Sequence, residues 1–152
     1  MSSNYIVNME HTAGIIGLIS TVRDKANKFI SQQLKHRGIE DIVPAHGAIF
    51  VSLFRNGELP MGQIAQIIER DKSTVTTLVN KLAGLGYLER RKADTDNRVT
   101  LIRLTEKGKS LETDFMDISK NLPARVYDGF SDLEKEILMT LLSRVKNNLQ
   151  FF

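Results

Sequence analysis

The sequence predicts a mainly α-helical protein with one small β-hairpin. Apolar residues recur at intervals of three and four along most of the 152 residues, which is the period of amphipathic helices. Near residues 87–104 this period gives way to two short strand-like runs that flank a polar loop. Hydrophobic residues make up 41% of the chain, enough to form a core, and we expect residues 1–152 to form a single domain.

The first two helices have clear end signals. A long helix is expected over residues 8–35, and Gly38 follows it after a basic stretch that suits a helix C-terminus. Pro44 opens the second helix, because its ring fits a first helical turn, and Asn56-Gly57 ends it. The stripe along the first helix consists of Ile15, Ile19, Val22, Ala26, Phe29 and Ile30.

A short third helix and a longer fourth helix follow. The third is expected over residues 61–68 and the fourth over about 72–85. Asp71 is a suitable N-cap for the fourth helix, because a short carboxylate accepts hydrogen bonds from the unpaired amides of a first turn. The apolar face of this helix consists of Val75, Leu78, Val79, Leu82 and Leu85.

The strand-like runs cover residues 87–91 and 99–104. They enclose the loop 92–98, whose aspartates and asparagine favour turns. Helices followed in this order by two strands and a polar hairpin loop are typical of a winged helix-turn-helix. We place this motif at residues 59–104, with the hairpin as its wing.

Two more helices are expected after the hairpin. Thr105 caps a long one, in which Pro123 must introduce a kink or a break. Ser131 and Glu134 form a capping box at the start of the last one. Its apolar stripe consists of Ile137, Leu138, Leu141, Leu142, Val145 and Leu149. Long amphipathic helices near both ends of a small chain could serve an ordinary intrachain core, but they favour burial between two copies of the chain.

Positive charge is concentrated in the winged region. Between Glu69 and Arg103 there are eight basic and five acidic residues, an excess of three that equals the net charge of the whole chain. The remainder of the sequence is therefore neutral. A local excess of this kind is what a protein needs to bind a polyanion.

Several classes of function and site are disfavoured. The chain has no cysteine, which excludes disulfides and thiol-based sensing. His11, His36 and His46 contain no i,i+4 pair, so we expect no metal site, and no cofactor motif is present. No catalytic constellation stands out, so we expect a protein that is not an enzyme. No apolar run could span a membrane and the N-terminus does not resemble a secretory signal, which together predict a cytoplasmic protein.

The outward side of the fourth helix carries side chains able to reach phosphates and base edges in a major groove. The wing supplies a second set of polar and basic groups for the adjacent backbone or minor groove. Asp96 is expected to interact with Arg98 and so to structure the wing rather than to contact an anion. The residues predicted to bind DNA are Lys72, Ser73, Thr74, Thr76, Thr77, Asn80 and Lys81 on the helix and Arg91, Lys92, Thr95, Asn97 and Arg98 on the wing.

The motifs around this region resemble the MarR family of bacterial regulators. The resemblance is carried by residues 71–76 (DKSTVT), 78–82 (LVNKL), 86–90 (GYLER), 96–98 (DNR) and 101–108 (LIRLTEKG). Its most specific part is the Asp-x-Arg wing followed by Leu-Thr-x-x-Gly. The family usually has a glycine in the turn before the fourth helix and two consecutive arginines in the wing. Here these positions carry Glu69-Arg70 and Arg98-Val99.

The resemblance implies a homodimer that binds a palindromic operator in double-stranded DNA. Residues 44–104 would form the DNA-binding lobe, and residues 8–35 and 105–150 the dimerisation helices. The protein would act as a repressor that a small aromatic or phenolic effector releases from DNA. A cavity between lobe and dimer helices is implied as well, with Ile15, Ile19, His46 and Phe50 as its candidate lining.

Two other interpretations of the polar helix face remain open. It could be an ordinary solvated surface, since hydroxyl and charged faces are common on helices. It could also bind a protein, as some winged helices do, although its basic character favours DNA.

Overall fold

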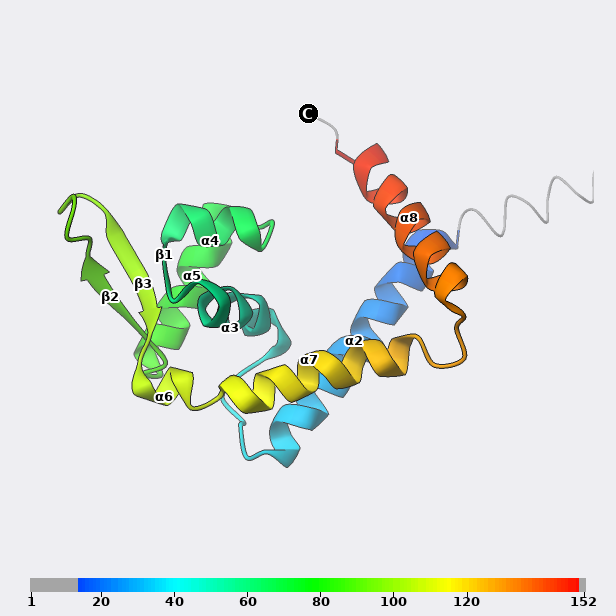
Figure 1. Ribbon diagram of the computed structural model, residues 1–152, viewed down its shortest axis with the longest axis horizontal. Helices are drawn as coiled ribbons and strands as arrows, with labels where there is room; N and C mark the ends of the chain where they lie inside the picture. The colour runs from blue at the N-terminus through cyan, green and yellow to red at the C-terminus, as the bar shows by residue number, and fades with distance from the viewer. Residues whose placement is uncertain (1–13, 151–152) are drawn as a thin grey trace, which may run out of the picture. The chain divides into compact units, whose positions relative to one another are not determined.

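The computed structural model describes residues 14–150, and its backbone is mainly helical with one small sheet (Figure 1). The chain forms two compact units, one ending at Ile118 and the other beginning at Ser119. The elements are α2 (Ile15–His36), α3 (Pro44–Asn56), β1 (Glu58–Pro60), α4 (Met61–Ile67), α5 (Lys72–Gly84), β2 (Leu88–Lys92), β3 (Thr100–Leu104), α6 (Glu106–Lys109), α7 (Glu112–Val126) and α8 (Asp132–Asn148).

The predicted helices before the hairpin are confirmed to within a residue or so at the ends that the structure describes. The expected start of the first helix at residue 8 lies outside the described residues. Pro44 does open α3, and Gly57, with φ of 76°, ends it. A positive φ is readily adopted only by glycine, which explains why the helix stops there.

The sheet contains a strand that the sequence did not reveal. Its order is β1-β3-β2 and both pairings are antiparallel, with Leu59 opposite Ile102 and Leu88 opposite Leu104. These four side chains are buried. A run of three residues is too short to display the alternation by which strands are recognised, and β1 exists because it pairs with the edge of β3.

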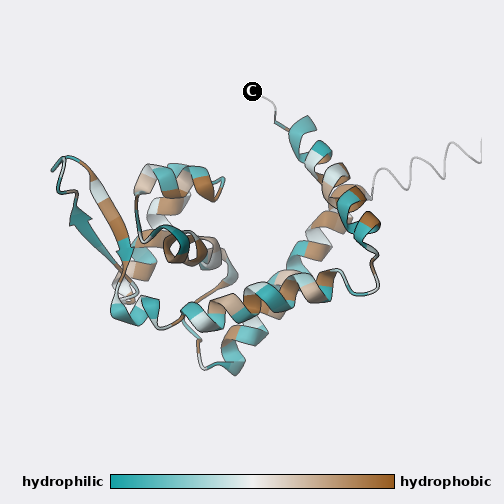
Figure 2. Cartoon of the chain, in the orientation of Figure 1, coloured by the Kyte–Doolittle hydropathy of each residue, from teal (hydrophilic) through white to brown (hydrophobic). Residues whose placement is uncertain are grey.

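The core of the unit that ends at Ile118 is built around α3. Phe50 is fully buried and its ring packs against the rings of Phe54, Tyr87 and Phe115, at centroid distances of 5.9, 5.7 and 4.7 Å. In the hydropathy view α3 is largely hydrophobic whereas β2 is largely hydrophilic (Figure 2). The aromatic cluster therefore joins α3, the start of β2 and the first turns of α7.

The prediction of one long helix after Thr105 is wrong. Thr105 does act as an N-cap, because its Oγ1 accepts the amide hydrogen of Gly108 at 3.2 Å. However, the Leu111 amide bonds to the carbonyl of Gly108, only three residues back, and the Ser110 hydroxyl donates to the Lys107 carbonyl at 2.8 Å. This tightened turn separates the four-residue α6 from α7, a detail that apolar spacing does not encode.

Pro123 does not end a helix either. It lies inside α7, which continues to Val126, and the Tyr127 amide donates to the Pro123 carbonyl at 2.9 Å. A proline removes one amide donor, and the three residues after it in α7 stay helical in spite of that loss.

The last helix has the predicted capping box but no buried face. The Glu134 carboxylate accepts the Ser131 amide hydrogen at 2.8 Å, and the Ser131 hydroxyl faces the Glu134 amide. Within α8 no residue is buried, and Leu133 and Leu149 are 66% and 63% exposed. The apolar stripe predicted from the sequence is thus present, and none of its residues is buried.

Among residues 14–150, no helix combines the length and the apolar character needed to cross a lipid bilayer.

Candidate nucleic-acid interface

Helix α5 is held firmly by its apolar face. Val75, Val79 and Leu82 have no exposed surface, and they pack with α3, α4 and the sheet in a single core cluster. Side chains three and four residues apart share one side of a helix, so burial of these three directs the remaining positions to solvent. The opposite side of α5 is therefore exposed to solvent.

The start of α5 is fixed by Asp71, as predicted. Its carboxylate accepts the Ser73 hydroxyl at 2.5 Å, the Thr74 amide at 2.8 Å and the Thr74 hydroxyl at 2.7 Å. These bonds, first of all that from the Ser73 side chain, hold the pKa of Asp71 far below its usual range. The cap is consequently ionised at neutral pH and keeps both hydroxyls turned toward it.

The turn between α4 and α5 has the geometry that usually demands glycine. Glu69 adopts a φ of 51°, in the left-handed region, and the next amide, that of Arg70, donates to the Ala65 carbonyl at 3.0 Å. The stretch where the family usually has a glycine therefore contains a left-handed residue in this chain too. The non-glycine residue takes the strained conformation itself.

The polar face of α5 is exposed at every position named from the sequence. Two threonines in its middle bond back to the helix, Thr76 to the Lys72 carbonyl at 2.7 Å and Thr77 to the Ser73 carbonyl at 3.1 Å. Further along, the Asn80 side-chain oxygen accepts a hydrogen bond from the Arg90 guanidinium of β2. The exposed positions are Lys72, Ser73, Thr74, Thr76, Thr77, Asn80 and Lys81.

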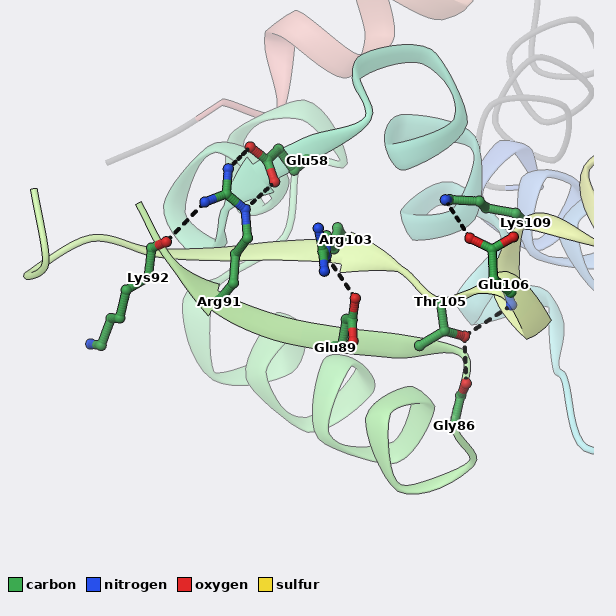
Figure 3. A network of polar contacts seen from close by, with 10 residues as sticks. Glu58, Gly86, Glu89, Arg91, Lys92, Arg103, Thr105, Glu106 and Lys109 are labelled. Carbon is green, nitrogen blue, oxygen red and sulfur yellow. Dashed lines mark hydrogen bonds and ion pairs between the residues drawn. The ribbon is translucent and has the colours of Figure 1, made fainter. Parts of the chain in front are cut away.

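The base of the wing is an ion-pair network on one face of the sheet (Figure 3). Arg91 of β2 donates to both carboxylate oxygens of Glu58 on β1, at 2.7 and 2.5 Å, and reaches Asp94 at 3.1 Å. Hydrogen bonding between the two groups lowers the pKa of Glu58 and raises that of Arg91. Nearby, Arg103 donates to Glu89 at 2.7 Å. Arg91, predicted as a DNA contact, thus has its guanidinium engaged by carboxylates of its own chain.

The tip of the wing is ordered by Asp96. Its carboxylate accepts the Arg98 amide hydrogen at 2.8 Å, whereas the Arg98 guanidinium lies 3.9 Å away. The predicted interaction of the two residues is present, and the short bond is made by the backbone. The Arg98 side chain remains 94% exposed. Thr95 and Asn97 are exposed as well, and the Lys92 ammonium contacts the Thr100 hydroxyl at 3.2 Å.

A surface hollow lies beside the start of α5. Two cationic residues, Arg70 and Lys72, line it together with Val99 at the wing and polar residues of α4. Its remaining lining consists of Pro60, Gly62, Gln63, Ala65, Gln66 and Asp71. Gln63 and Gln66 were not singled out from the sequence, because isolated glutamines on a short helix carry no signal of their own.

The four residues expected to line an effector cavity lie in different surroundings. Phe50 lies in the aromatic core, and the buried His46 accepts the Val43 amide hydrogen through Nδ1 at 3.2 Å. Burial lowers the pKa of His46. Ile15 and Ile19 are 41% and 39% exposed near the start of α2. None of the four lines the hollow at α5 or the second hollow, formed by residues of α8.

Among residues 14–150, no three His, Cys, Asp or Glu side chains converge in a way that could hold a metal ion. His11 lies outside the described residues.

The sequence comparisons agree with this geometry. The model of the MarR family matches residues 44–100, which run from the start of α3 to the start of β3. The transcriptional regulator MhqR of Bacillus subtilis is 30% identical over 133 residues, an alignment that covers 86% of this chain and 91% of the relative. The chain belongs to the MarR family. It is a DNA-binding transcription regulator of the MarR type and not an enzyme, as predicted.

A further relative and a solved structure are consistent with membership of the MarR family. YdgJ, an uncharacterised regulator of B. subtilis, is 26% identical over 97 residues, covering 64% of this chain and 59% of that relative. A mutant MarR from Escherichia coli, solved in complex with operator DNA, superimposes with a TM-score of 0.73. It is 20% identical, and the match covers 95% of this chain and 98% of that one, so the two share a fold.

Proposed function

We propose that this MarR-family regulator is a homodimeric repressor that binds a palindromic operator and leaves it when a small aromatic or phenolic effector binds. The observations that carry the DNA-binding part are the exposed polar face of α5, whose opposite side is buried in the core, and the exposed Arg98 of the wing. A helix of this kind fits a major groove, and an arginine on a hairpin suits the adjacent backbone or minor groove.

The dimer is supported by uncovered apolar surface. In α8, Ile137, Leu141 and Leu142 are 47%, 49% and 39% exposed, and they lie on the same broad side of the helix as the exposed Leu149. Exposed apolar stripes of this length are unfavourable in water and are normally buried against a partner. A second copy of the chain is the proposed partner, and two-fold symmetry would then require a palindromic operator.

The dimer is tested by light scattering on the purified protein. We expect twice the chain mass of 17.2 kDa for the wild type. Leu141→Glu places a charge in the apolar stripe and should give monomers. Ser143→Glu, on the opposite side of α8, introduces the same charge and should leave the mass unchanged. A monomeric wild type would overturn the proposed dimer.

Operator binding is tested with DNA from upstream of the protein's own gene. We expect binding much tighter than to a scrambled duplex, and affinity that falls steeply with salt because phosphate contacts release counterions. Addition of the protein to a transcription reaction on the same DNA should lower transcript yield, as a repressor requires. Equal affinity for both duplexes would contradict the proposal, and a raised yield would contradict the sign of regulation.

Effector release is tested by a thermal-shift screen with phenolic acids. A ligand that binds the folded state raises the unfolding temperature, and a genuine effector must also weaken operator binding. A screen without any stabilising compound would count against this effector class.

A further inference from the structure

The middle of α5 exposes a surface with an unusual distribution of hydrogen-bond donors and acceptors. Ser73, Thr76, Thr77 and Asn80 lie three and four residues apart and therefore form one exposed line along the helix. If α5 enters a major groove, as the proposed function requires, this line faces the base edges.

Every hydroxyl hydrogen in this part of the helix is already used. The acceptors are the Asp71 carboxylate for Ser73 and Thr74, the Lys72 carbonyl for Thr76 and the Ser73 carbonyl for Thr77. Carboxylate and carbonyl oxygens cannot donate, so each hydroxyl must be the donor. What the threonines retain for a partner is a γ-methyl group and an oxygen lone pair.

The side chain of Asn80 also makes a hydrogen bond within the chain. Its side-chain oxygen accepts a hydrogen bond from the Arg90 guanidinium, which occupies one of the two lone pairs of that oxygen. Bidentate recognition of adenine needs the oxygen and the nitrogen of an asparagine at once. The bond to Arg90 competes with that contact, so Thr76 and Thr77, in the middle of the exposed line, are the side chains whose base contacts we consider.

We propose that Thr76 and Thr77 recognise thymine through their γ-methyl groups, and that the operator half-site carries A·T pairs beneath the middle of α5. The inference rests on the proposed function. In the major groove an A·T pair offers the thymine methyl and the N6 amine of adenine, which match a methyl group and an acceptor oxygen. A G·C pair also offers one amine donor, on cytosine N4, but it has no methyl, so the methyl contact is what favours A·T.

The experiment begins by selecting the preferred half-site from randomised duplexes with wild-type protein. Each thymine of that site is then replaced by deoxyuridine, which lacks only the 5-methyl group. We expect a symmetrical replacement under α5 to weaken binding roughly fourfold per methyl, and roughly fifteenfold for the pair, given about 0.8 kcal/mol per buried methyl-sized group.

Two sets of variants, one that keeps the γ-methyl and one that keeps the hydroxyl, identify the group that contacts the base. Thr76→Val and Thr77→Val keep a γ-methyl and should retain the deoxyuridine penalty. Thr76→Ser and Thr77→Ser keep the hydroxyl but lack the γ-methyl, so the deoxyuridine penalty should disappear. Lys72→Ala is the control, because a lost phosphate contact weakens thymine and uracil duplexes equally. Circular dichroism checks that each variant folds.

The outcomes separate the inference from the proposed function. A wild type that binds its selected site with no deoxyuridine penalty overturns methyl recognition and leaves operator binding intact. Methyl recognition by the threonines is likewise overturned if the serine variants keep the penalty. A wild type that selects no sequence at all overturns the proposed function, and the inference falls with it.

Discussion

The Tyr87 hydroxyl donates to the Asp41 carboxylate, with its oxygen 2.9 and 3.1 Å from the two acceptors, across 46 positions of sequence. Tyr87 follows helix α5, whereas Asp41 lies in the connection between α2 and α3. The Lys107 ammonium lies 4.0 Å from the centroid of the Tyr87 ring and 3.9 Å from Asp41. The residue after helix α5 is thereby bonded to the segment that connects α2 to α3.

Tyr87→Phe should lower the free energy of unfolding by about 1 kcal/mol, since the ring packing survives and one hydrogen bond to a charged acceptor is lost. Burial, together with the bond to Asp41, raises the pKa of Tyr87 to about 12, so the neutral donor is present throughout the usual pH range. The measurement is urea unfolding, with an unchanged slope and a lower midpoint. Asp41→Asn keeps an acceptor for the Tyr87 hydroxyl, so it should lower the free energy of unfolding by less than Tyr87→Phe does. An unchanged midpoint for Tyr87→Phe would show that the bond contributes nothing.

The Leu-Thr-x-x-Gly motif has a physical explanation that yields a second prediction. A Cβ at Gly108 would overlap the Tyr87 carbonyl oxygen and would crowd Leu104. Because the obstacle includes backbone, it cannot simply move aside, and Gly108→Ala should cost at least about 2 kcal/mol of stability. Gly47→Ala is the matched control: its Cβ meets no atom within 4 Å, and in helix α3 alanine should stabilise by up to about 1 kcal/mol. Equal unfolding midpoints for both variants would contradict this explanation.

Helix positions and caps could be predicted from local sequence because their causes are local. Asp71 and Ser131 form the caps that their residue types indicate, and the stripe of Val75, Val79 and Leu82 is buried as its spacing requires. The strand β1 and the role of Glu58 depend on pairing with residues more than 30 positions away. No local signal distinguishes that glutamate from a solvated one, and the same holds for Arg91 until the strand order is known.

The turn before α5 shows that a sequence pattern can also suggest a structural difference that is not there. A missing family glycine at Glu69 suggests altered geometry, yet the backbone reaches a φ of 51° without it. A single residue can adopt the left-handed region at a cost of about 1–2 kcal/mol when its neighbours fix the turn. Here the bonded Arg70 amide and the capped start of α5 supply that constraint.

His46 gives a prediction for pH. Burial lowers its pKa below the ordinary value of 6.5, Lys81 adds to the effect and Asp41 opposes it. The unfolded chain therefore binds a proton more readily than the folded one, so stability is complete above pH 6.5 and falls as the pH drops through the lowered folded-state pKa. Carboxylates with lowered pKa values, such as Glu58, begin to reduce the stability only when the pH falls to near their ordinary pKa of 4.5.

The measurement is the urea midpoint between about pH 7.5 and 5, a range that brackets the ordinary histidine pKa. His46→Asn removes the titration and preserves an acceptor for the Val43 amide, so its midpoint should vary much less over this range. Parallel pH profiles for the two proteins would rule out His46 as the source.

Arg91 and Arg98 carry the same charge on the same wing, but the structure gives them different surroundings. Arg91 bonds to Glu58 and Asp94, whereas the Arg98 side chain is 94% exposed. Arg98→Ala should therefore weaken operator binding on the order of tenfold and reduce the salt slope by about one per wing, with no change in the unfolding temperature. Arg91→Ala should lower the unfolding temperature, because it leaves two carboxylates without their partner.

Anisotropy titrations at several salt concentrations, paired with thermal unfolding, separate the two effects. Lys109→Ala is the control for loss of one positive charge, since it lies on α6 and pairs with Glu106 at 2.7 Å. If Arg91→Ala reduced the salt slope as much as Arg98→Ala at an unchanged unfolding temperature, Arg91 would be a phosphate contact that releases its carboxylates when DNA binds. The proposed division between a structural arginine and a DNA-binding arginine would then be wrong.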